Sequence, residues 1–331
     1  TLEGRIHDLI PENLEVWMNN GVNRMSIGIQ SFNTEVRQMV GRLDTKETVL
    51  ERLAALKAYG QCSVVIDLIY GLPGQTMEVW EQDLADLVSS GVDGADLYQL
   101  NVFDGSDLNK DIANGKVPAA ATTAMQGDMF KFGRKYLDER SYRRLSAAHW
   151  SANNRERSLY NILAKAGVPM FPFGSGAGGN VDGYGMMLHR ALKPYEDMVS
   201  RGEKPFMALM KQSELQPVVN QVVSQLEQGF LNIMSLVTLD PRLEELNWLY
   251  KLWEERGLLT YNGLLYKLTA AGEFWTVNLT QSTLEAVEYI MTGKNSFAME
   301  AVAAQDTKTT SKDNPNQEVR GIGPVSYTHL T

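Results

Sequence analysis

The N-terminal part of the chain alternates apolar, β-branched runs with amphipathic helical segments, and this alternation limits the folds that it can adopt. The apolar runs predict strands at residues 24–30 (RMSIGIQ), 63–71 (SVVIDLIYG) and 95–102 (ADLYQLNV). The segments beside them predict helices at residues 11–20, 45–59 and 76–90, each with a glycine just past its end. Strands that alternate with covering helices indicate a parallel α/β sheet, either a barrel or an open doubly wound sheet.

The pattern changes after about residue 121. Residues 121–139 and 155–167 predict helices, with a strand at 142–151 between them, and residues 171–185 (FPFGSGAGGNVDGYG) read as glycine-rich and irregular. Further along, the chain reads as mostly helical, apart from a hairpin turned by Asn262-Gly263. A hairpin flanked by helices resembles a winged-helix unit, and because acidic residues outnumber basic ones there, we favour a structural or lid role over DNA binding.

These changes predict the domain organisation. We expect a partial barrel with its extension over residues 1–190 and a mainly helical, winged-helix-like domain over 191–292. The remaining residues, 293–331, are polar and predict a disordered tail. Its last residues, PVSYTHLT, resemble translated adapter sequence rather than native protein.

Charge and cysteine content narrow the classes of partner and location. A net charge of −9 argues against nucleic acid or an anionic membrane as a partner. The longest apolar run, VVIDLIYGL, carries Asp67 and is too short to span a bilayer, and we find no charged-then-apolar secretory leader. The lone Cys62 excludes an internal disulfide framework and predicts a reducing, cytoplasmic location.

Polar side chains fall at or near the C-terminal ends of successive predicted strands, the edge where parallel α/β folds bind ligands. They are Glu3, Gln30, Asp67 and Tyr98, with Arg42 on the loop after the second strand. Arg42 would bind a carboxylate and Glu3 an amino group, while Asp67 and Gln30 would hold ribose hydroxyls. Each residue taken singly is better explained as a cap, a turn anchor or a surface ion pair. Taken together, these residues support a structural role and a binding site for a zwitterionic nucleoside about equally.

Two motifs in order, RMSIGIQSFNTEVRQMVGR (24–42) and IDLIYGLPGQT (66–76), carry a family resemblance. They resemble the core of the radical S-adenosylmethionine (radical SAM) enzymes related to oxygen-independent coproporphyrinogen III oxidase. The resemblance implies an incomplete parallel β/α barrel, of the TIM type, that holds S-adenosylmethionine across its mouth. It assigns cofactor contacts to the side chains of Glu3, Gln30, Arg42 and Asp67 and to the backbone of Tyr98.

A narrower resemblance lies in HWSANNRERSLYNILAKAGVPMFPFGSGAGG (149–179), which is similar to the ChuW/HutW branch of anaerobic haem-degrading methyltransferases. Such enzymes reductively cleave S-adenosylmethionine, transfer a methyl group to haem and open the macrocycle to release iron. The resemblance therefore implies haem or a related tetrapyrrole as substrate and a reducing electron donor such as flavodoxin. Together the two resemblances cover residues 1–292.

Candidate substrate residues also lie in this segment. Arg155 and Arg157 are candidates for binding haem propionates, and His149 for meeting the haem iron or donating a proton. The structural alternatives are a solvated helix start for the arginines and a hydrogen-bonded core position for the histidine, and they are the stronger readings. The GSGAGG stretch either forms a close turn or presents its amides to a flat ligand.

The chain departs from the family in its cysteines. The family holds a 4Fe–4S cluster with a CxxxCxxC loop, which is absent here, and Cys62 reads as a core residue. Because the chain starts at Thr1 on what reads as a strand end, we expect an inactive fragment that lacks the first barrel units. For the intact parent we expect a haem-opening radical SAM methyltransferase. The alternatives are an oxygen-independent coproporphyrinogen III oxidase and a non-enzymatic haem chaperone.

Overall fold

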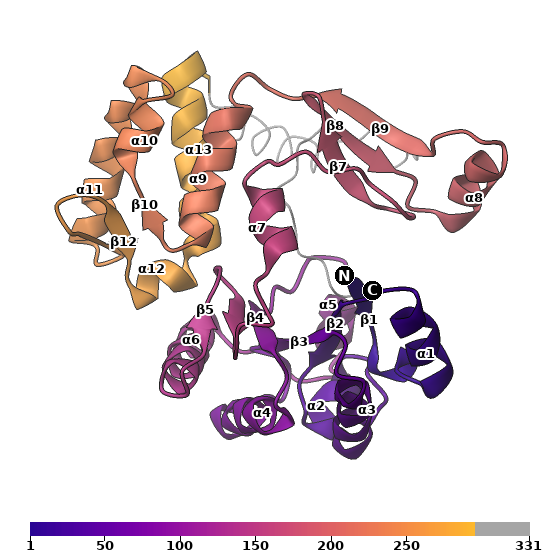
Figure 1. Ribbon diagram of the computed structural model, residues 1–331. Coiled ribbons are helices and arrows are strands. Elements are labelled where there is room, and N and C mark those ends of the chain that lie inside the picture. The colour runs from indigo at the N-terminus through magenta and orange to yellow at the C-terminus, as the bar shows by residue number, and fades with distance from the viewer. Residues whose placement is uncertain (295–331) are drawn as a thin grey trace. The chain divides into compact units, whose positions relative to one another are not determined.

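The chain divides into two compact units in a computed structural model that describes residues 1–294 (Figure 1). The first unit comprises Thr1–Arg157, and the second begins at Ser158. This division falls earlier in the chain than the predicted domain boundary at residue 190. The predicted boundary between the barrel with its extension and the C-terminal domain stays a prediction. The predicted disorder and non-native end of the tail concern residues that lie almost entirely outside the described part.

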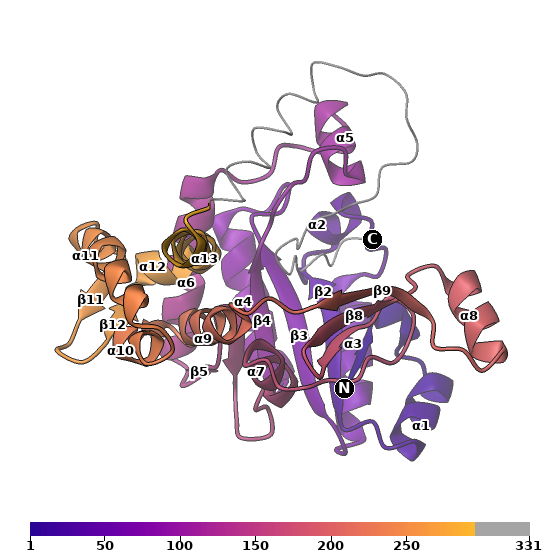
Figure 2. The same ribbon diagram turned by 90° about the horizontal axis from the view of Figure 1, so that it is seen from above.

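The first unit is built on a six-stranded sheet with the order β1-β2-β3-β4-β6-β5. Its strands are β1 (Leu2–Gly4), β2 (Arg24–Gln30), β3 (Ser63–Tyr70), β4 (Gly94–Gln99), β5 (Arg143–Arg144) and β6 (His149–Ser151). The β1 to β4 strands are parallel neighbours, and β6 and β5 continue the sheet in the antiparallel sense. Because β1 and β5 are its edges, the sheet that the described residues form is an incomplete barrel wall (Figure 2).

Helices connect and cover these strands. They are η1 (Ile6–Asp8), α1 (Pro11–Asn19), α2 (Thr34–Met39), α3 (Lys46–Ala58), α4 (Met77–Ser90), α5 (Asp107–Ala113) and α6 (Thr123–Asp138). Figure 1 shows α2, α3, α4 and α6 on one side of the sheet. The predicted strands and helices of this unit are thus confirmed to within a few residues. The predicted single strand at 142–151 is instead the short pair β5 and β6.

The two faces of the sheet are told apart by Tyr70 of β3. Its ring centroid lies 5.8 Å from that of Trp80 in α4 and 6.2 Å from that of Phe130 in α6, so Tyr70 points to the helices. Side chains alternate along a strand, so Asp67 and Ile69 point to the opposite face. Every residue of β3 is buried, which explains why its sequence is an almost unbroken apolar run.

The second unit combines helices with two small antiparallel sheets, of order β7-β8-β9 and β10-β12-β11. Its strands are β7 (Gly178–Val181), β8 (Tyr184–Leu188), β9 (Phe206–Lys211), β10 (Phe230–Leu231), β11 (Leu259–Tyr261) and β12 (Tyr266–Leu268). Its helices are α7 (Leu159–Lys165), α8 (Leu192–Ser200), α9 (Gln216–Glu227), α10 (Ile233–Val237), η2 (Pro241–Leu246), α11 (Asn247–Glu255), α12 (Ala270–Phe274) and α13 (Thr276–Thr292). In neither unit does the described chain contain a helix long and apolar enough to cross a membrane.

The structure corrects two predictions in this unit. The segment expected to be irregular contains most of the β7–β8 hairpin, whose two-residue turn is Asp182-Gly183 with both φ angles positive. In the other hairpin, Tyr261 pairs with Tyr266, so four residues rather than two form the loop. The side chain of Asn262 stabilises this longer loop by accepting hydrogen bonds from two backbone amides inside it.

Candidate functional site

A row of polar residues crosses the face of the first sheet that points away from α4 and α6. Directly paired residues of neighbouring strands share a face, and the register pairs Gly28 with Asp67, Asp67 with Asp96, and Asp96 with His149. On the other side of β2, Glu3 pairs with Ser26. Tyr98 lies further along β4, opposite Ile69, and packs into the small apolar cluster around that residue.

Gln30 ends β2 in an unusual backbone conformation. The strand register shifts between Gly28 and Gln30, and φ of Gln30 is +73°, which is rare for a residue with a side chain. Its side chain is buried, and neither the oxygen nor the nitrogen of its amide finds a hydrogen-bond partner in the part of the chain that the structure describes. A buried amide with no partner is costly, so this one is suited to a ligand that supplies the partners.

Gly28 brings Gln30 and Arg42 together. A Cβ atom added to Gly28 would lie 3.0 Å from Nε2 of Gln30 and 3.9 Å from Nη2 of Arg42. Both side chains therefore reach over the backbone of β2 beside Asp67. Gly28 was not among the residues predicted from the sequence, although its place two residues before Gln30 on a buried strand was a usable signal.

For the S-adenosylmethionine site that the family resemblance implies, we expect Gly28→Ala to weaken binding of S-adenosylhomocysteine by about tenfold or more, because the methyl group displaces the Gln30 amide. Isothermal titration calorimetry measures the affinity, and circular dichroism checks that the fold is kept. Gly127→Ala in α6 is the matched control, since an added Cβ there meets nothing within 4 Å. Equal affinities for the two variants would contradict the expectation.

Charge gathers around Asp67. Ser26 donates a hydrogen bond of 3.3 Å to its carboxylate. Burial raises the pKa of Asp67 well above the usual range, and the charges of Asp96 and Glu3 raise it further. Burial also lowers the pKa of Arg42, while the nearby charge of Asp67 opposes that effect. Glu3, Arg42 and Asp67 therefore lie within one electrostatic neighbourhood beside the Gln30 amide.

A buried arginine holds the Gln30 segment in place. Nη1 of Arg37 donates to the backbone oxygens of Ile29, at 2.5 Å, and Ser31, at 3.1 Å, which are the residues on either side of Gln30. Nε of Arg37 donates to the oxygen of Asp44 at 2.9 Å, close to Arg42 in the chain. The side chain is 1% exposed, and this burial lowers the pKa of Arg37 to about 10. The side chain of Arg37 thus holds the backbone on either side of Gln30 and also the backbone of Asp44, two residues after Arg42.

Asp83 of α4 holds the residues that follow Gln30 in place. Its carboxylate accepts hydrogen bonds from the hydroxyl of Ser31, the backbone amide of Phe32 and the side chain of Gln75. Burial raises the pKa of Asp83 to about 6, although these hydrogen bonds oppose the shift. The strained Gln30 is therefore fixed on both sides by buried charged groups.

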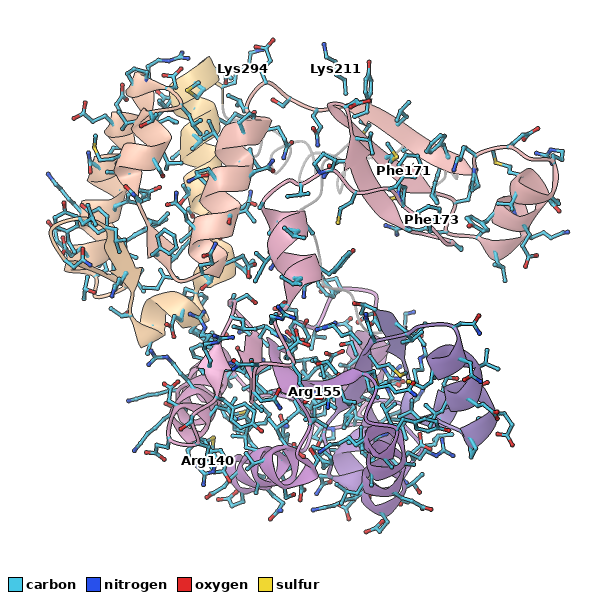
Figure 3. All side chains as sticks on the ribbon, viewed as in Figure 1. Arg140, Arg155, Phe171, Phe173, Lys211 and Lys294 are labelled. Atoms are coloured by element: carbon cyan, nitrogen blue, oxygen red, sulfur yellow. The ribbon has the colours of Figure 1, made fainter. Side chains whose placement is uncertain are left out.

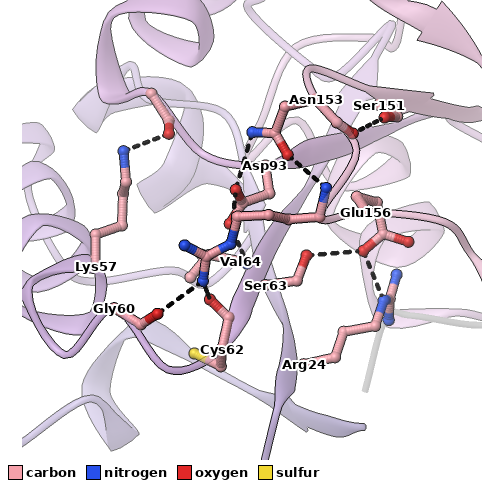
Figure 4. A network of polar contacts seen from close by, with 12 residues as sticks. Arg24, Lys57, Gly60, Cys62, Ser63, Val64, Asp93, Ser151, Asn153 and Glu156 are labelled. Carbon is pink, nitrogen blue, oxygen red and sulfur yellow. Dashed lines mark hydrogen bonds and ion pairs between the residues drawn. The ribbon is translucent and has the colours of Figure 1, made fainter.

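His149 is fully buried in β6, between two carboxylates. Nδ1 lies 2.9 Å from Oδ2 of Asp96, and Nε2 lies 3.3 Å from Oε1 of Glu156, a charge-pair distance without good hydrogen-bond geometry. The other oxygen of Glu156 accepts from Nε of Arg24 at 2.8 Å and from Ser63 at 3.1 Å (Figure 4). This placement matches the structural alternative for His149, a hydrogen-bonded core position. A substrate-binding role for it stays a prediction.

Arg155 and Arg157 lie apart from this row. Arg155, labelled in Figure 3, donates through Nη2 to the backbone oxygens of Gly60 and Cys62, just before β3 begins, and its Nε lies 3.5 Å from Asp93. Figure 4 labels these three partners. These groups belong to the N-terminal ends of the parallel strands, opposite the end that carries Gln30. Arg157 is exposed at the last position of the unit. Propionate binding by the two arginines therefore stays a prediction.

Three further members of the buried network escaped the sequence analysis. Asp96 follows an alanine in ADLY as Asp67 follows an isoleucine in IDLI, and this parallel would have identified it. Glu156 sits inside the charge run NNRER and carries no signal that it is buried. Arg24, its partner, opens β2 and reads as a surface charge.

The residues present do not fit an iron–sulfur cluster. Such clusters are held by several cysteine thiolates. The chain has one cysteine, Cys62, which is buried, and burial raises the pKa of its thiol. Within residues 1–294 the structure contains no group of three or more histidine, cysteine, aspartate or glutamate side chains arranged to hold a metal ion.

Known proteins resemble this chain in sequence and in fold. Residues 2–87 match the radical SAM superfamily. Anaerobilin synthase of Escherichia coli O157:H7 is 35% identical over 291 residues, which are 88% of this chain and 64% of that protein. The haem chaperone HemW of Lactococcus lactis is 29% identical over 55% of this chain and 48% of its own length. Oxygen-independent coproporphyrinogen III oxidase of Helicobacter pylori J99 is 25% identical over 87% of this chain and 65% of its own length.

The solved structure of coproporphyrinogen III oxidase (HemN) from Escherichia coli superposes with a TM-score of 0.69 at 19% identity, over 85% of this chain and 68% of that one. This likeness shows the fold and confirms the predicted α/β class, a partial barrel wall with a further helical part. The chain spans less than two thirds of the length of each of the three sequence relatives named above. Residues 2–87 thus match the radical SAM superfamily, and the chain is similar in sequence to anaerobilin synthase and to coproporphyrinogen III oxidases.

Proposed function

We propose that the protein containing this chain is a radical SAM enzyme that opens haem without oxygen to a linear tetrapyrrole, transfers a methyl group and releases iron. The observation that carries the proposal is the unsatisfied Gln30 amide beside Arg42 and Asp67, at the positions where the family resemblance expects the cofactor. The similarity to anaerobilin synthase over 88% of the chain supports haem as the substrate class.

The side chains divide the work of binding S-adenosylmethionine. Asp67 and Gln30 hold the ribose hydroxyls, because an ionised carboxylate accepts hydrogen bonds and an amide both donates and accepts. Arg42 binds the carboxylate of the methionine part, and Glu3 accepts from its amino group. Tyr98 contributes a backbone contact.

When bound and reductively cleaved, S-adenosylmethionine supplies the radical and methyl-transfer chemistry. The chain's own residues bind the cofactor, orient it and exclude water from it. This chain offers no ligand set for a 4Fe–4S cluster. The intact protein draws electrons from a reduced donor such as flavodoxin.

The test uses the full-length parent with haem, S-adenosylmethionine and a reductant under anaerobic conditions. We expect the haem absorbance to disappear and a methylated linear tetrapyrrole to form, detected by mass spectrometry. The variant Gln30→Leu should lose this activity while keeping its fold, since its side chain replaces the binding amide by an apolar group of similar size.

Two other outcomes would contradict the proposal and identify a different function. Haem that stays bound and intact points to a chaperone, the function in the name of the relative HemW. Conversion of propionates to vinyl groups on coproporphyrinogen III points to the oxidase, the activity in the name of the relatives from Helicobacter pylori.

A further inference from the structure

The polar row on the face of the first sheet that points away from α4 and α6 extends beyond the residues proposed to contact the cofactor. Asp67 on β3, Asp96 on β4 and His149 on β6 occupy directly paired positions on three neighbouring strands. All three are buried, with exposed fractions of 4%, 5% and 0%. A buried ionisable group is tolerated only when a partner compensates it, so the charges in this row depend on one another.

His149 carries the compensating positive charge. A neutral imidazole has a single N–H, whereas the imidazolium offers one on each nitrogen. Here one nitrogen faces Asp96 at 2.9 Å and the other faces Glu156 at 3.3 Å, so both sides of the ring meet carboxylate oxygen. Burial alone would lower the pKa of His149, but the charge and hydrogen bond of Asp96, together with Glu156, raise it to about 9.

The charge of His149 matters for Asp67 because of what else faces that carboxylate. Glu3 from β1 and Asp96 from β4 are like charges that hold its proton more tightly. Arg42, from the segment after α2, is an opposite charge that interacts with Asp67. Without His149, Asp96 would lose its cation, and two buried carboxylates on adjacent strands would compete to ionise.

We propose that His149 is a positioning residue for the nucleoside site: its imidazolium pairs with Asp96 and thereby makes Asp67 easier to ionise, so that its carboxylate accepts hydrogen bonds from the ribose. This inference rests on the proposed function, since it places a nucleoside beside Asp67. Glu156, held by Arg24 and Ser63, keeps the ring in orientation from the far side. This role requires no contact between His149 and the cofactor.

The charge of His149 is measured first, without any ligand. The chain has four histidines, and the His149→Gln variant identifies the signal of interest in a ¹⁵N spectrum of the labelled imidazoles. We expect both ring nitrogens of His149 to keep the shifts of an imidazolium from pH 6 to pH 8. A neutral tautomer at pH 7 would overturn the inference whatever the ligand does.

The affinity for S-adenosylhomocysteine is then measured by calorimetry between pH 6 and pH 9. Losing the cation makes Asp67 harder to ionise, so the binding curve of His149→Gln should move to higher pH by about one unit. At pH 7 its affinity should fall by about tenfold. The double variant Asp96→Asn/His149→Gln removes the competing carboxylate as well and should regain most of the lost affinity.

The outcomes separate the two proposals. If the unmodified chain does not bind S-adenosylhomocysteine at any pH, the proposed function fails, while the imidazole spectrum still decides the charge of His149. If it binds and His149→Gln shows the same pH profile, the inference fails alone. A double variant that binds no better than the single one at every pH also overturns the inference, because a purely structural role predicts accumulated damage. Thermal melts of all variants verify that they are folded.

Discussion

Replacing Glu156 by alanine should lower the free energy of unfolding of the first unit by about 3–5 kcal/mol. The side chain is fully buried, and one of its oxygens accepts hydrogen bonds from Arg24 at 2.8 Å and Ser63 at 3.1 Å. The other lies 3.3 Å from the ring of His149. Alanine leaves the buried imidazolium of His149 and the guanidinium of Arg24 without this carboxylate, which costs far more free energy than the loss of a surface ion pair. Urea denaturation followed by circular dichroism measures the change.

Glu139→Ala is the matched control for this substitution. The side chain of Glu139 is 57% exposed and lies 3.7 Å from Lys135, an arrangement typical of a weak surface pair. We expect its removal to change the stability by about 0.5 kcal/mol or less. If Glu156→Ala were as mild as this control, the buried network would not stabilise the unit as described.

The same network gives stability a defined pH dependence. Burial opposes the ionisation of Glu156, but His149 and Arg24 outweigh it and lower the pKa of Glu156 to about 2. Its stabilising contribution is therefore present above the ordinary carboxyl pKa of about 4.5 and is lost as the pH falls through about 2. His149, with its pKa raised to about 9, contributes stability that is fully present below about pH 6.5 and is lost as the pH rises through 9.

Melting temperatures recorded from pH 2 to pH 10 should fall at both ends. His149→Gln should flatten the alkaline limb, and an unchanged limb would contradict this assignment.

Arg37→Met should cost about 3 kcal/mol or more and should also loosen the candidate site. Methionine fills much of the same space but leaves the buried backbone oxygens of Ile29, Ser31 and Asp44 without their donor. Since two of these flank Gln30, its strained conformation loses a support. We expect both a lower urea midpoint and weaker binding of S-adenosylhomocysteine in the variant that remains folded.

Arg140→Met is the control for the buried arginine. The guanidinium of Arg140 lies on the surface, 3.4 Å from the ring centroid of Tyr136, and its label in Figure 3 lies at the edge of the first unit. Its loss should cost about 1 kcal/mol at most and leave ligand binding unchanged. Arg37→Met that binds the ligand normally would show that Gln30 is positioned by other groups.

The sequence was sufficient for the parallel part of the fold, because the apolar runs of β2 and β3 and the helix ends each carry a local signal. The sequence also predicts that Glu3, Gln30, Arg42 and Asp67 gather at one edge, since parallel strands bring their C-terminal ends together, and in the structure the charges of Glu3 and Arg42 act on Asp67. That these residues bind a cofactor stays a prediction. The antiparallel return of β6 beside β4 has no local signal, because it depends on a pairing between residues distant in the chain. The buried Glu156 was missed for the same reason.

Other parts of the site depend on geometry that composition does not encode. The register shift before Gln30 turns its amide over Gly28, and this shift is visible only once β2 is paired with β3. The fixed position of Gln30 depends on Arg37, which reads in sequence as an ordinary helical surface residue. In the second unit, the Asp182-Gly183 turn did carry a local hairpin signal, which the glycine-rich composition around it obscured.

The proposed site brings the amide of Gln30 against a nucleoside beside Arg42 and Asp67. The most direct measurement follows the side-chain amide of Gln30 in a ¹H–¹⁵N spectrum, assigned by its absence in Gln30→Leu, while S-adenosylhomocysteine is added. We predict that both amide protons shift and saturate at the same ligand concentration as the binding isotherm. An amide signal that stays in place while the ligand binds would put the nucleoside elsewhere and contradict the account.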